Sequence, residues 1–568
     1  MGAVLVRYLV CSLAVVACSS KAQETEKRAP VTTTNVADTG YGSASLGAIA
    51  FAVSDGSPEA RGHFTRGLLA LHSFWYDEAI RQFDAAITAD PSMKMAYWGA
   101  AMSRCKLLWG DDDVATARRL LAQMPNPEQL TPREQAWVAA TRELLAGDSV
   151  RLSRKRFAAA MEALNATFPD DESAVFLALA QLSASQPTDP DNLAVRKHAA
   201  ELAIGVFTHN PNHPGAAHYI IHAYDTPELA PLALPYARKY AEIAPGAFHA
   251  RHMPAHIFSR LGMWQEAIAS CRAAWEVSVE AARREKLSVD HEDFHSLSWI
   301  IEMSFELGKR GDADLAMAKF VDAVRTGLDH HTRALYAVEV TNYLGRTGEW
   351  SRVDDLLKPL ESAADAQPAS SGHCASLPTS SPDELQERKA ALGARARAAA
   401  MQHDLATTTR YLAEMDAVNE SIRAFLQTTV PEQALAMFDE ANANRRAGLL
   451  ARAKGDDTAL LKILRDSVAA ADLESGGESN PTAFLIHEEI ADTLLKLEQP
   501  KAAMDEYALA LDRQPNRARS LLGAARAAMK LGDRQAARAR YAKLLEVWRG
   551  AAANTEGLVE ARAAVNAP

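Results

Sequence analysis

The chain has 568 residues, of which 48% are hydrophobic, and its formal net charge is −11 at neutral pH. Its 61 Lys and Arg residues are scattered singly among 72 Asp and Glu residues, without the basic stripe that binds a phosphate backbone, which argues against nucleic acid as a partner. Alanine-rich stretches with few β-branched or aromatic runs favour helices over sheets.

The first residues are typical of an export signal. One arginine precedes the apolar run YLVCSLAVVA, whose length of about ten residues suits a signal peptide and is too short to span a bilayer. The letters VVAC resemble the lipobox of bacterial lipoproteins, which implies lipidation of Cys18, and Ser19 fits retention at the outer membrane, facing the periplasm. The alternative is an ordinary signal peptide cut at a small residue. We expect a signal peptide over 1–18 and a flexible, Ser- and Thr-rich tether over 19–57.

The rest of the chain has the rhythm of repeated helix pairs. In HFTRGLLALHSFWYDEAIRQFDAAITADPS, small and large residues alternate at Gly67, Ala79 and Phe83, and Pro91 follows. A small residue lets two helices cross closely, and a proline ends the second helix before the next pair begins. Apolar residues recur at helical spacing up to the C-terminal end, with a Ser/Pro-rich interruption over 361–384.

One helix pair cannot bury its apolar face alone, so neighbouring pairs must stack. We therefore predict an all-α fold, a solenoid of stacked antiparallel helix pairs, built as one array or as two arrays joined by a linker. The expected divisions are repeats over 58–360, a linker or loop over 361–384 and repeats over 385–568.

Histidines cluster in the middle of the chain as three pairs with members four residues apart. The first two pairs are 34 residues apart and the third follows 39 residues later. The pairs are His218 and His222, His252 and His256, and His291 and His295. A spacing of 34 is the length of one two-helix repeat, so the histidines recur at equivalent places in consecutive repeats.

The 34-residue period and these packing positions resemble the tetratricopeptide-repeat superfamily over nearly all of residues 60–548. GAAHYIIHAYD followed by HARHMPAHIFSRLGMW is similar to a set of bacterial tetratricopeptide lipoproteins with such histidine motifs. The resemblance implies the fold and a place in the cell envelope, and it implies no activity. It also implies that His249, His252 and His256 face the concave groove, where such repeats hold peptide or protein partners.

These histidines are candidate ligands of a transition metal. Residues four apart share a helix face, and neighbouring helices pack about 10 Å apart, so imidazoles from consecutive repeats can reach one point. Imidazole favours zinc, copper or iron over calcium or magnesium. The candidate ligands are His218, His222, His249, His252, His256, His291 and His295. Flanking carboxylates that can orient the rings or act as acid and base are Asp225, Asp290, Glu292 and Asp293.

Two features complicate this hypothesis. Pro254 lies between His252 and His256, so a helix either begins near that point or bends there. A neutral histidine in a groove can also simply donate a hydrogen bond to a ligand or a neighbouring helix. His72, in the first repeat, is expected to be a packing or surface residue far from the cluster.

Three functions remain open. The chain is a lipid-anchored scaffold that binds a peptide or protein and carries a metal site, or a metal-dependent hydrolytic or oxidative enzyme, or a metal store or sensor. A nucleophile motif, a phosphate loop and a dinucleotide fingerprint are all missing from the sequence. Consequently no catalytic residue and no organic cofactor is assigned.

Overall fold

The computed structural model describes residues 45–566 except 111, 148, 365–380, 428–431 and 474–482. The described part is helical, with one isolated β-bridge between Cys105 and Asp112 and no named strand. The predicted all-α class is therefore confirmed. Cys18 and the expected signal peptide lie outside the described residues.

The chain divides into two compact units, which differ from the predicted divisions. The N-terminal unit comprises 45–224 and 235–253, and the C-terminal unit comprises 225–234 and 254–566. Across the expected linker, α17 (His330–Thr347) packs against α19 (Pro382–Met401), so the helices on either side of it belong to the same unit.

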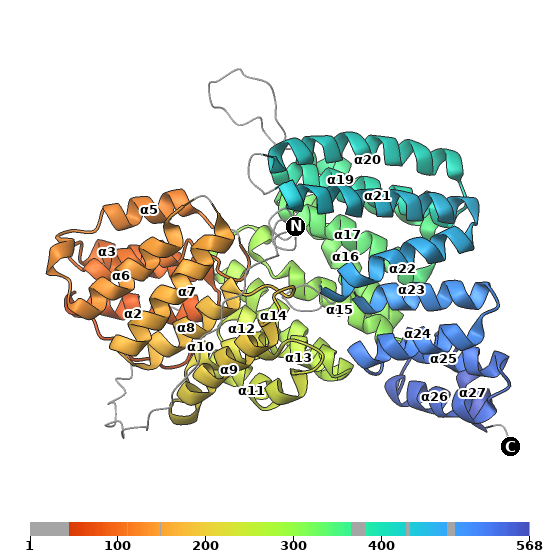
Figure 1. Cartoon of the computed structure of the whole chain (residues 1–568), viewed down its shortest axis with the longest axis horizontal. Coiled ribbons are helices and arrows are strands. Elements are labelled where there is room, and N and C mark those ends of the chain that lie inside the picture. The colour runs from red at the N-terminus through yellow and green to blue at the C-terminus, as the bar shows by residue number, and fades with distance from the viewer. Residues whose placement is uncertain are drawn as a thin grey trace. The chain divides into compact units, whose positions relative to one another are not determined.

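The N-terminal unit is a run of helices that contact chiefly their neighbours in sequence (Figure 1). Its elements are α2 (Pro58–His72), α3 (Tyr76–Ala89), α4 (Lys94–Met102), α5 (Val114–Ala122), η1 (Pro127–Gln129), α6 (Pro132–Leu145), α7 (Val150–Thr167), α8 (Asp171–Ala184), α9 (Asn192–His209), α10 (Pro214–Tyr224), the larger part of α11 (Ala230–Ile243) and α12 (Phe248–His252).

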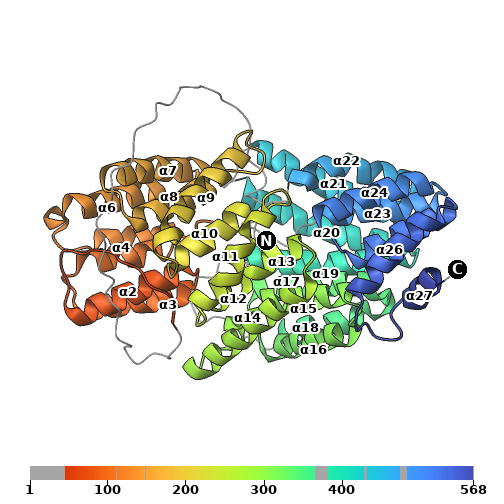
Figure 2. The same ribbon diagram turned by 90° about the horizontal axis from the view of Figure 1, so that it is seen from below.

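The C-terminal unit continues the same pattern of stacked helices (Figure 2). Besides α17 and α19 its elements are α13 (Pro254–Arg260), α14 (Trp264–Glu285), η2 (Val289–His291), α15 (Phe294–Glu306), α16 (Arg310–Thr326), η3 (Trp350–Arg352), α18 (Val353–Ala364), α20 (Leu405–Leu426), α21 (Glu432–Lys454), α22 (Asp457–Leu473), α23 (Ala483–Lys496), α24 (Pro500–Arg513), α25 (Ala518–Lys530), α26 (Arg534–Val547) and α27 (Leu558–Asn566). In the part of the chain that is described, none of the helices combines the length and the apolar character needed to span a membrane.

The small residues of the repeat sit where large rings approach. A Cβ atom added to Gly67 would lie 3.0 Å from the Phe83 ring, and one added to Gly99 would lie 2.2 Å from it. In the C-terminal unit a Cβ on Gly523 would lie 2.2 Å from Tyr507. Glycine is required at Gly99 and Gly523 because the ring occupies the space of the missing side chain, and at Gly67 the ring leaves little room for one. The predicted stacking of helix pairs through small and large positions is thus confirmed.

Residues 45–57, expected to be part of the tether, are instead packed against the N-terminal unit. The Phe51 ring lies 5.4 Å from the Trp98 ring and 5.3 Å from the Trp137 ring. The Ala48 N–H donates to the Asn212 carbonyl at 2.9 Å. This stretch lacks helical periodicity, but its aromatic side chain and its backbone hydrogen bonds hold it, so the folded unit already includes residue 45.

The C-terminal unit brings into contact turns that lie far apart in its sequence. The Trp264 indole N–H donates to the Asn516 carbonyl at 2.9 Å, and Asn516 Nδ2 donates to the Gly262 carbonyl at 3.2 Å. Nearby, the Ala518 N–H donates to Glu306 Oε2 at 2.7 Å. The first two contacts join the turn between α13 and α14 to the turn between α24 and α25, and the third joins the end of α15 to the start of α25.

Candidate functional site

Two helices of the N-terminal unit present the central histidines. α10 begins after His213, whose Nδ1 accepts a hydrogen bond from the Ala216 N–H at 3.2 Å, so that this imidazole caps the helix. His218 and His222 follow on one face of α10. His249 lies on the five-residue helix α12, which ends at His252.

Pro254 explains why α12 is short. Proline cannot donate a backbone hydrogen bond to the preceding turn, and the chain begins a new helix, α13, at that residue. His252 therefore lies on α12 in the N-terminal unit, and His256 lies on α13 in the C-terminal unit. The pair does not share one helix face.

Three imidazoles of the N-terminal unit converge, and we call them the imidazole triad: His218, His222 and His249. The His218 Nε2 atom lies 2.9 Å from His222 Nε2 and 3.1 Å from His249 Nε2. All three side chains are buried, with exposed fractions of 0%, 6% and 6%. The triad therefore gathers three ring nitrogens at one point within the unit.

A backbone carbonyl determines which nitrogen of His218 carries the proton. His218 Nδ1 lies 2.6 Å from the carbonyl oxygen of His72, the last residue of α2. A carbonyl oxygen only accepts, so Nδ1 carries the proton, and in the neutral ring Nε2 has a lone pair. That lone pair points at the other two members of the triad. Such a second hydrogen bond is the usual way to orient a metal-binding histidine.

Aromatic rings surround the triad. Phe74 stacks on His222 and on His249, each at 5.5 Å between ring centroids, and its ring lies 4.4 Å from that of His218. Trp109 meets His249 edge-on at 5.6 Å, and Tyr240 stacks on His218 at 5.0 Å. This packing holds the ring planes and keeps the environment apolar.

A second buried group lies in the same unit, and we call it the Glu172 group: His72, Glu172 and His213. Glu172 Oε2 lies 2.8 Å from His72 Nε2, and Glu172 Oε1 lies 3.3 Å from His213 Nε2. All three side chains are fully buried. Burial alone would raise the pKa of Glu172, but the adjacent imidazoles of His72 and His213 lower it to about 2. Burial lowers the pKa of His72.

Two other predicted residues meet in the C-terminal unit. Asp225 Oδ2 lies 3.0 Å from His256 Nδ1, and Arg260 Nε donates to Asp225 Oδ1 at 2.9 Å. Burial alone would raise the pKa of Asp225, but Arg260 and His256 hold it well below its usual range. Asp225 thus contacts a ring nitrogen of His256, the kind of contact expected of a carboxylate that orients a histidine.

His295 lies on α15 in the same unit as His256. Its ring centroid is 5.8 Å from that of Trp299, and the His256 ring centroid is 4.7 Å from that of Trp299. Burial, together with the neighbouring His256 and His331, lowers the pKa of His295 to about 3. His295 is therefore a neutral imidazole at physiological pH.

The remaining predicted residues make other contacts. His291 is exposed in η2, with its Nδ1 3.3 Å from Ser288 Oγ and 3.5 Å from Asp290. Asp293 caps α15 by accepting the Ser296 N–H at 3.0 Å, and burial raises its pKa. Burial also raises the pKa of Glu292. The structure gives Asp293 a helix-capping role, which its position before a helix explains.

Reasoning from the sequence missed the Glu172 group and misplaced His72. That histidine is fully buried, and its carbonyl contacts His218 directly. The expectation that it lies far from the cluster is wrong because α2 packs against α10, so a residue of the first repeat reaches the histidines. A local signal existed only for His213, which stands just before a proline at a helix start.

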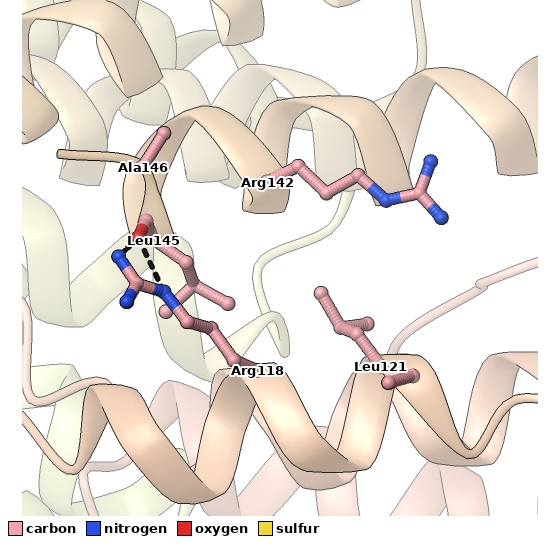
Figure 3. A pocket seen from close by; sticks show the side chains of 6 residues that line it. Arg118, Leu121, Arg142, Leu145 and Ala146 are labelled. Carbon is pink, nitrogen blue, oxygen red and sulfur yellow. Dashed lines mark hydrogen bonds between the residues drawn. The ribbon is translucent and has the colours of Figure 1, made fainter.

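A surface pocket of the N-terminal unit lies between α5 and α6 (Figure 3). It is lined by Arg118, Leu121, Ala122, Arg142, Leu145 and Ala146. Figure 3 shows the Arg118 guanidinium turned onto the Leu145 carbonyl, to which its Nε donates at 2.9 Å. The lining contains no imidazole, thiol or carboxylate, so the histidine groups are the better candidates for chemistry.

Comparison with known proteins gives a likeness in structure only. No family model matches the chain, and no curated protein matches it. Among solved structures, the chain is similar to the TPR domain of P58(IPK), at 15% identity over 70% of this chain and 98% of that one, with a TM-score of 0.20. It is also similar to the APC/C hetero-tetramer Cut9-Hcn1, at 11% identity over 89% and 96% of the two chains and a TM-score of 0.25. The third is yeast Tom70, at 12% identity over 89% and 95%, with a TM-score of 0.30.

TM-scores this low do not establish a shared arrangement. The fold class follows instead from the helices themselves and from the close packing of Gly67 and Gly99 on Phe83 and of Gly523 on Tyr507. The described part of the chain is an all-α fold of helices stacked on their neighbours in sequence.

Proposed function

We propose that this chain is a helical-repeat protein that binds one transition-metal ion through the Nε2 atoms of the imidazole triad. The observation that carries the proposal is the contact between His218 Nδ1 and the His72 carbonyl, which turns an unprotonated Nε2 toward the other two rings. Imidazole nitrogens suit zinc, copper or iron, and a buried, apolar setting of neutral ligands does not suit calcium or magnesium.

Hydrogen bonding alone accounts poorly for the triad. His218 Nε2 offers one lone pair, while two imidazoles approach it at 2.9 and 3.1 Å. An ion bound about 2.0–2.1 Å from each nitrogen in tetrahedral geometry would set the nitrogens roughly 3.3 Å apart. The observed distances are slightly shorter, so a small outward shift of two rings would seat the ion.

Metal content tests this proposal. The full chain is purified without a histidine tag and reconstituted separately with zinc, copper and iron. It should hold one equivalent of metal, and the double variant His222→Ala/His249→Ala should hold none. His209→Ala is the matched control, because His209 is exposed on the same unit and contacts Asp171 at 2.7 Å. Mass spectrometry measures the metal, and circular dichroism checks that helicity is kept. An equal metal content in parent and double variant would sink the proposal.

The number of protein ligands in the imidazole triad favours a metal-dependent enzyme as the second candidate function. Three protein ligands leave one tetrahedral position open to water or substrate, whereas structural zinc sites use four. A hydrolytic or oxidative reaction would use that position. A metal store or sensor would bind the same ion without turnover.

A peptide-binding role is supported by a separate observation. The chain's own residues 45–57 lie on the N-terminal unit as a segment without helix or strand, anchored by the Phe51 ring. The backbone and hydroxyl of Ser54 donate to the Glu134 carboxylate at 2.7 and 2.8 Å. A surface that holds a segment in this way suits a peptide partner of similar chemistry.

A peptide in trans tests this role. A variant that lacks 45–57 should bind a fluorescent synthetic peptide of the same residues, and the binding should survive chelation of metals. The Phe51→Ala peptide should bind at least about 10-fold more weakly, because the half-buried Phe51 ring packs on Trp98 and Trp137, and an aromatic anchor of this kind contributes more than about 1.4 kcal/mol. Fluorescence anisotropy measures both affinities. Failure of the parent peptide to bind a variant that is still helical would contradict the role.

We also propose that the protein is lipid-anchored at Cys18 and works in the bacterial cell envelope. The support is the lipobox-like VVAC after a short apolar run. A partner held by the repeats would then be a peptide or protein of the envelope, and the only contact with the membrane would be the lipid.

A further inference from the structure

The two histidine groups of the N-terminal unit carry their protons on different ring nitrogens. In the triad, His218 Nδ1 donates to a carbonyl, which leaves Nε2 free of a proton. In the Glu172 group, His213 Nδ1 accepts the Ala216 N–H, so that ring carries its proton on Nε2, which faces Glu172. One group presents a lone pair inward, and the other presents an N–H.

This difference decides what the Glu172 group can hold. Two histidines and a carboxylate match the donor set of many iron and zinc sites. However, binding a metal through His213 Nε2 would move the proton to Nδ1, against the Ala216 N–H. His72 Nε2 likewise lies 2.8 Å from Glu172 and acts as a donor to the ionised carboxylate. The group therefore presents an N–H donor from His72 to the Glu172 carboxylate, while His213 Nε2 lies 3.3 Å from the other carboxylate oxygen without a hydrogen bond to it.

The Glu172 group is tied to the triad through His72. The Tyr219 hydroxyl lies 3.0 Å from His72 Nδ1 and donates to it, because His72 Nε2 carries the proton. The next residue back on α10, His218, donates to the carbonyl of the same His72. The ring of His72 is therefore held by Glu172 and Tyr219, while its carbonyl orients a member of the triad.

We propose that Glu172 is a positioning residue of the metal site. It holds the His72 ring and thereby fixes the carbonyl that orients His218, and so it sets the metal affinity of the triad without touching the metal. This inference rests on the proposed metal-binding function. Outer hydrogen-bond partners of metal ligands typically change affinity about 10–100-fold when they are removed.

Cobalt(II) titration of the full chain, followed by visible absorption, tests the inference. Parent and Glu172→Gln should each bind one equivalent, with an affinity about 10–100-fold weaker in the variant, because the glutamine amide turns a donor toward one of the two imidazole N–H groups. Glu134→Gln is the matched control. Glu134 is also a buried carboxylate of this unit, 1% exposed, but it caps α6 and binds Ser54. If Glu172 had a merely structural role, Glu172→Gln and Glu134→Gln should lower the affinity for cobalt equally.

The outcomes separate the two proposals. A parent that takes up no cobalt overturns the metal-binding function, and the positioning role with it. A parent that binds one equivalent and a Glu172→Gln variant that binds as tightly overturn only the positioning role. If the parent bound two equivalents of cobalt and the variant one, the Glu172 group would itself be a metal site. That result would also overturn the positioning role.

A second variant covers the case in which Glu172→Gln does not fold. Tyr219→Phe removes only the hydroxyl that contacts His72 Nδ1, and the ring keeps its place in the core. The affinity for cobalt should fall several-fold with stoichiometry unchanged, since one of the two hydrogen bonds to the His72 ring is lost. An unchanged affinity would contradict the role given to the His72 ring.

Discussion

Replacement of Arg517 by methionine should lower the free energy of unfolding of the C-terminal unit by about 3–5 kcal/mol at pH 7, the range for breaking a buried ion pair. Arg517 Nε and Nη2 donate to the two oxygens of Glu488 at 2.8 and 3.0 Å. The two side chains are 4% and 1% exposed. Methionine matches the length of the side chain but leaves the Glu488 charge buried without its main partner.

The loss should depend on pH in a defined direction. Burial alone would raise the pKa of Glu488, but the charge and hydrogen bonds of Arg517 lower it to about 2. A depressed carboxyl pKa stabilises the folded parent fully above the unfolded value of about 4.3, and this contribution is lost as pH falls through the folded value of about 2. Without Arg517, Glu488 takes up a proton more readily. The difference in free energy of unfolding between the parent and the Arg517→Met variant should therefore shrink as pH falls from 7 to 4.

Urea unfolding by circular dichroism at both pH values measures this difference, and hydrogen exchange in α23 and α25 locates it. Arg410→Met is the control, because Arg410 pairs with Glu414 one turn away on the exposed side of α20, at 2.9 Å. Exposed pairs contribute little to stability. If Arg517→Met and Arg410→Met lost the same free energy of unfolding, the buried Arg517–Glu488 pair would contribute no more to stability than an exposed pair. The double variant Glu488→Leu/Arg517→Met should recover much of the loss, since an apolar pair leaves no unpaired charge.

Local sequence patterns predicted the helices of the C-terminal unit. They did not predict the contact between two of its turns that lie far apart in sequence. Gly67 and Phe83 lie within one repeat, and their packing follows from a short-range rule. The contact of Asn516 with Gly262 joins residues 254 apart in sequence. It depends on the accumulated turn of many helices, which no spacing within a single repeat reveals.

The same distinction explains the candidate site. His218 and His222 share a face of α10 because they are four residues apart, as predicted. His249 joins them from α12, a separate short helix that ends at His252 just before Pro254. Glu172 carries no local signal, since its partner His72 lies 100 residues away.

Replacement of Gly262 by alanine should break the contact between the α13–α14 turn and the α24–α25 turn of the C-terminal unit. Gly262 has a φ of +66°, and an added Cβ atom would lie 2.1 Å from the Pro515 carbonyl oxygen. The left-handed backbone costs a non-glycine residue about 1–2 kcal/mol, and the clash adds about 1–3 kcal/mol of overpacking. The turn must move away from Pro515, so the hydrogen bonds of Asn516 with Gly262 and Trp264 are lost. We therefore expect a total loss of about 2–5 kcal/mol.

Gly348→Ala separates the two causes. Gly348 has a φ of +73°, but no atom lies within 4 Å of an added Cβ, so this variant carries the backbone cost of about 1–2 kcal/mol without the clash. Urea unfolding compares the two variants, and hydrogen exchange of the Trp264 indole N–H reports on the contact itself. Faster exchange in Gly262→Ala alone would show that the turns have separated. If both variants lost the same free energy of unfolding and the Trp264 indole N–H exchanged at the parent's rate, the contact between the two turns would tolerate a side chain at Gly262. Stacking of neighbouring helices would then be enough to hold this unit together.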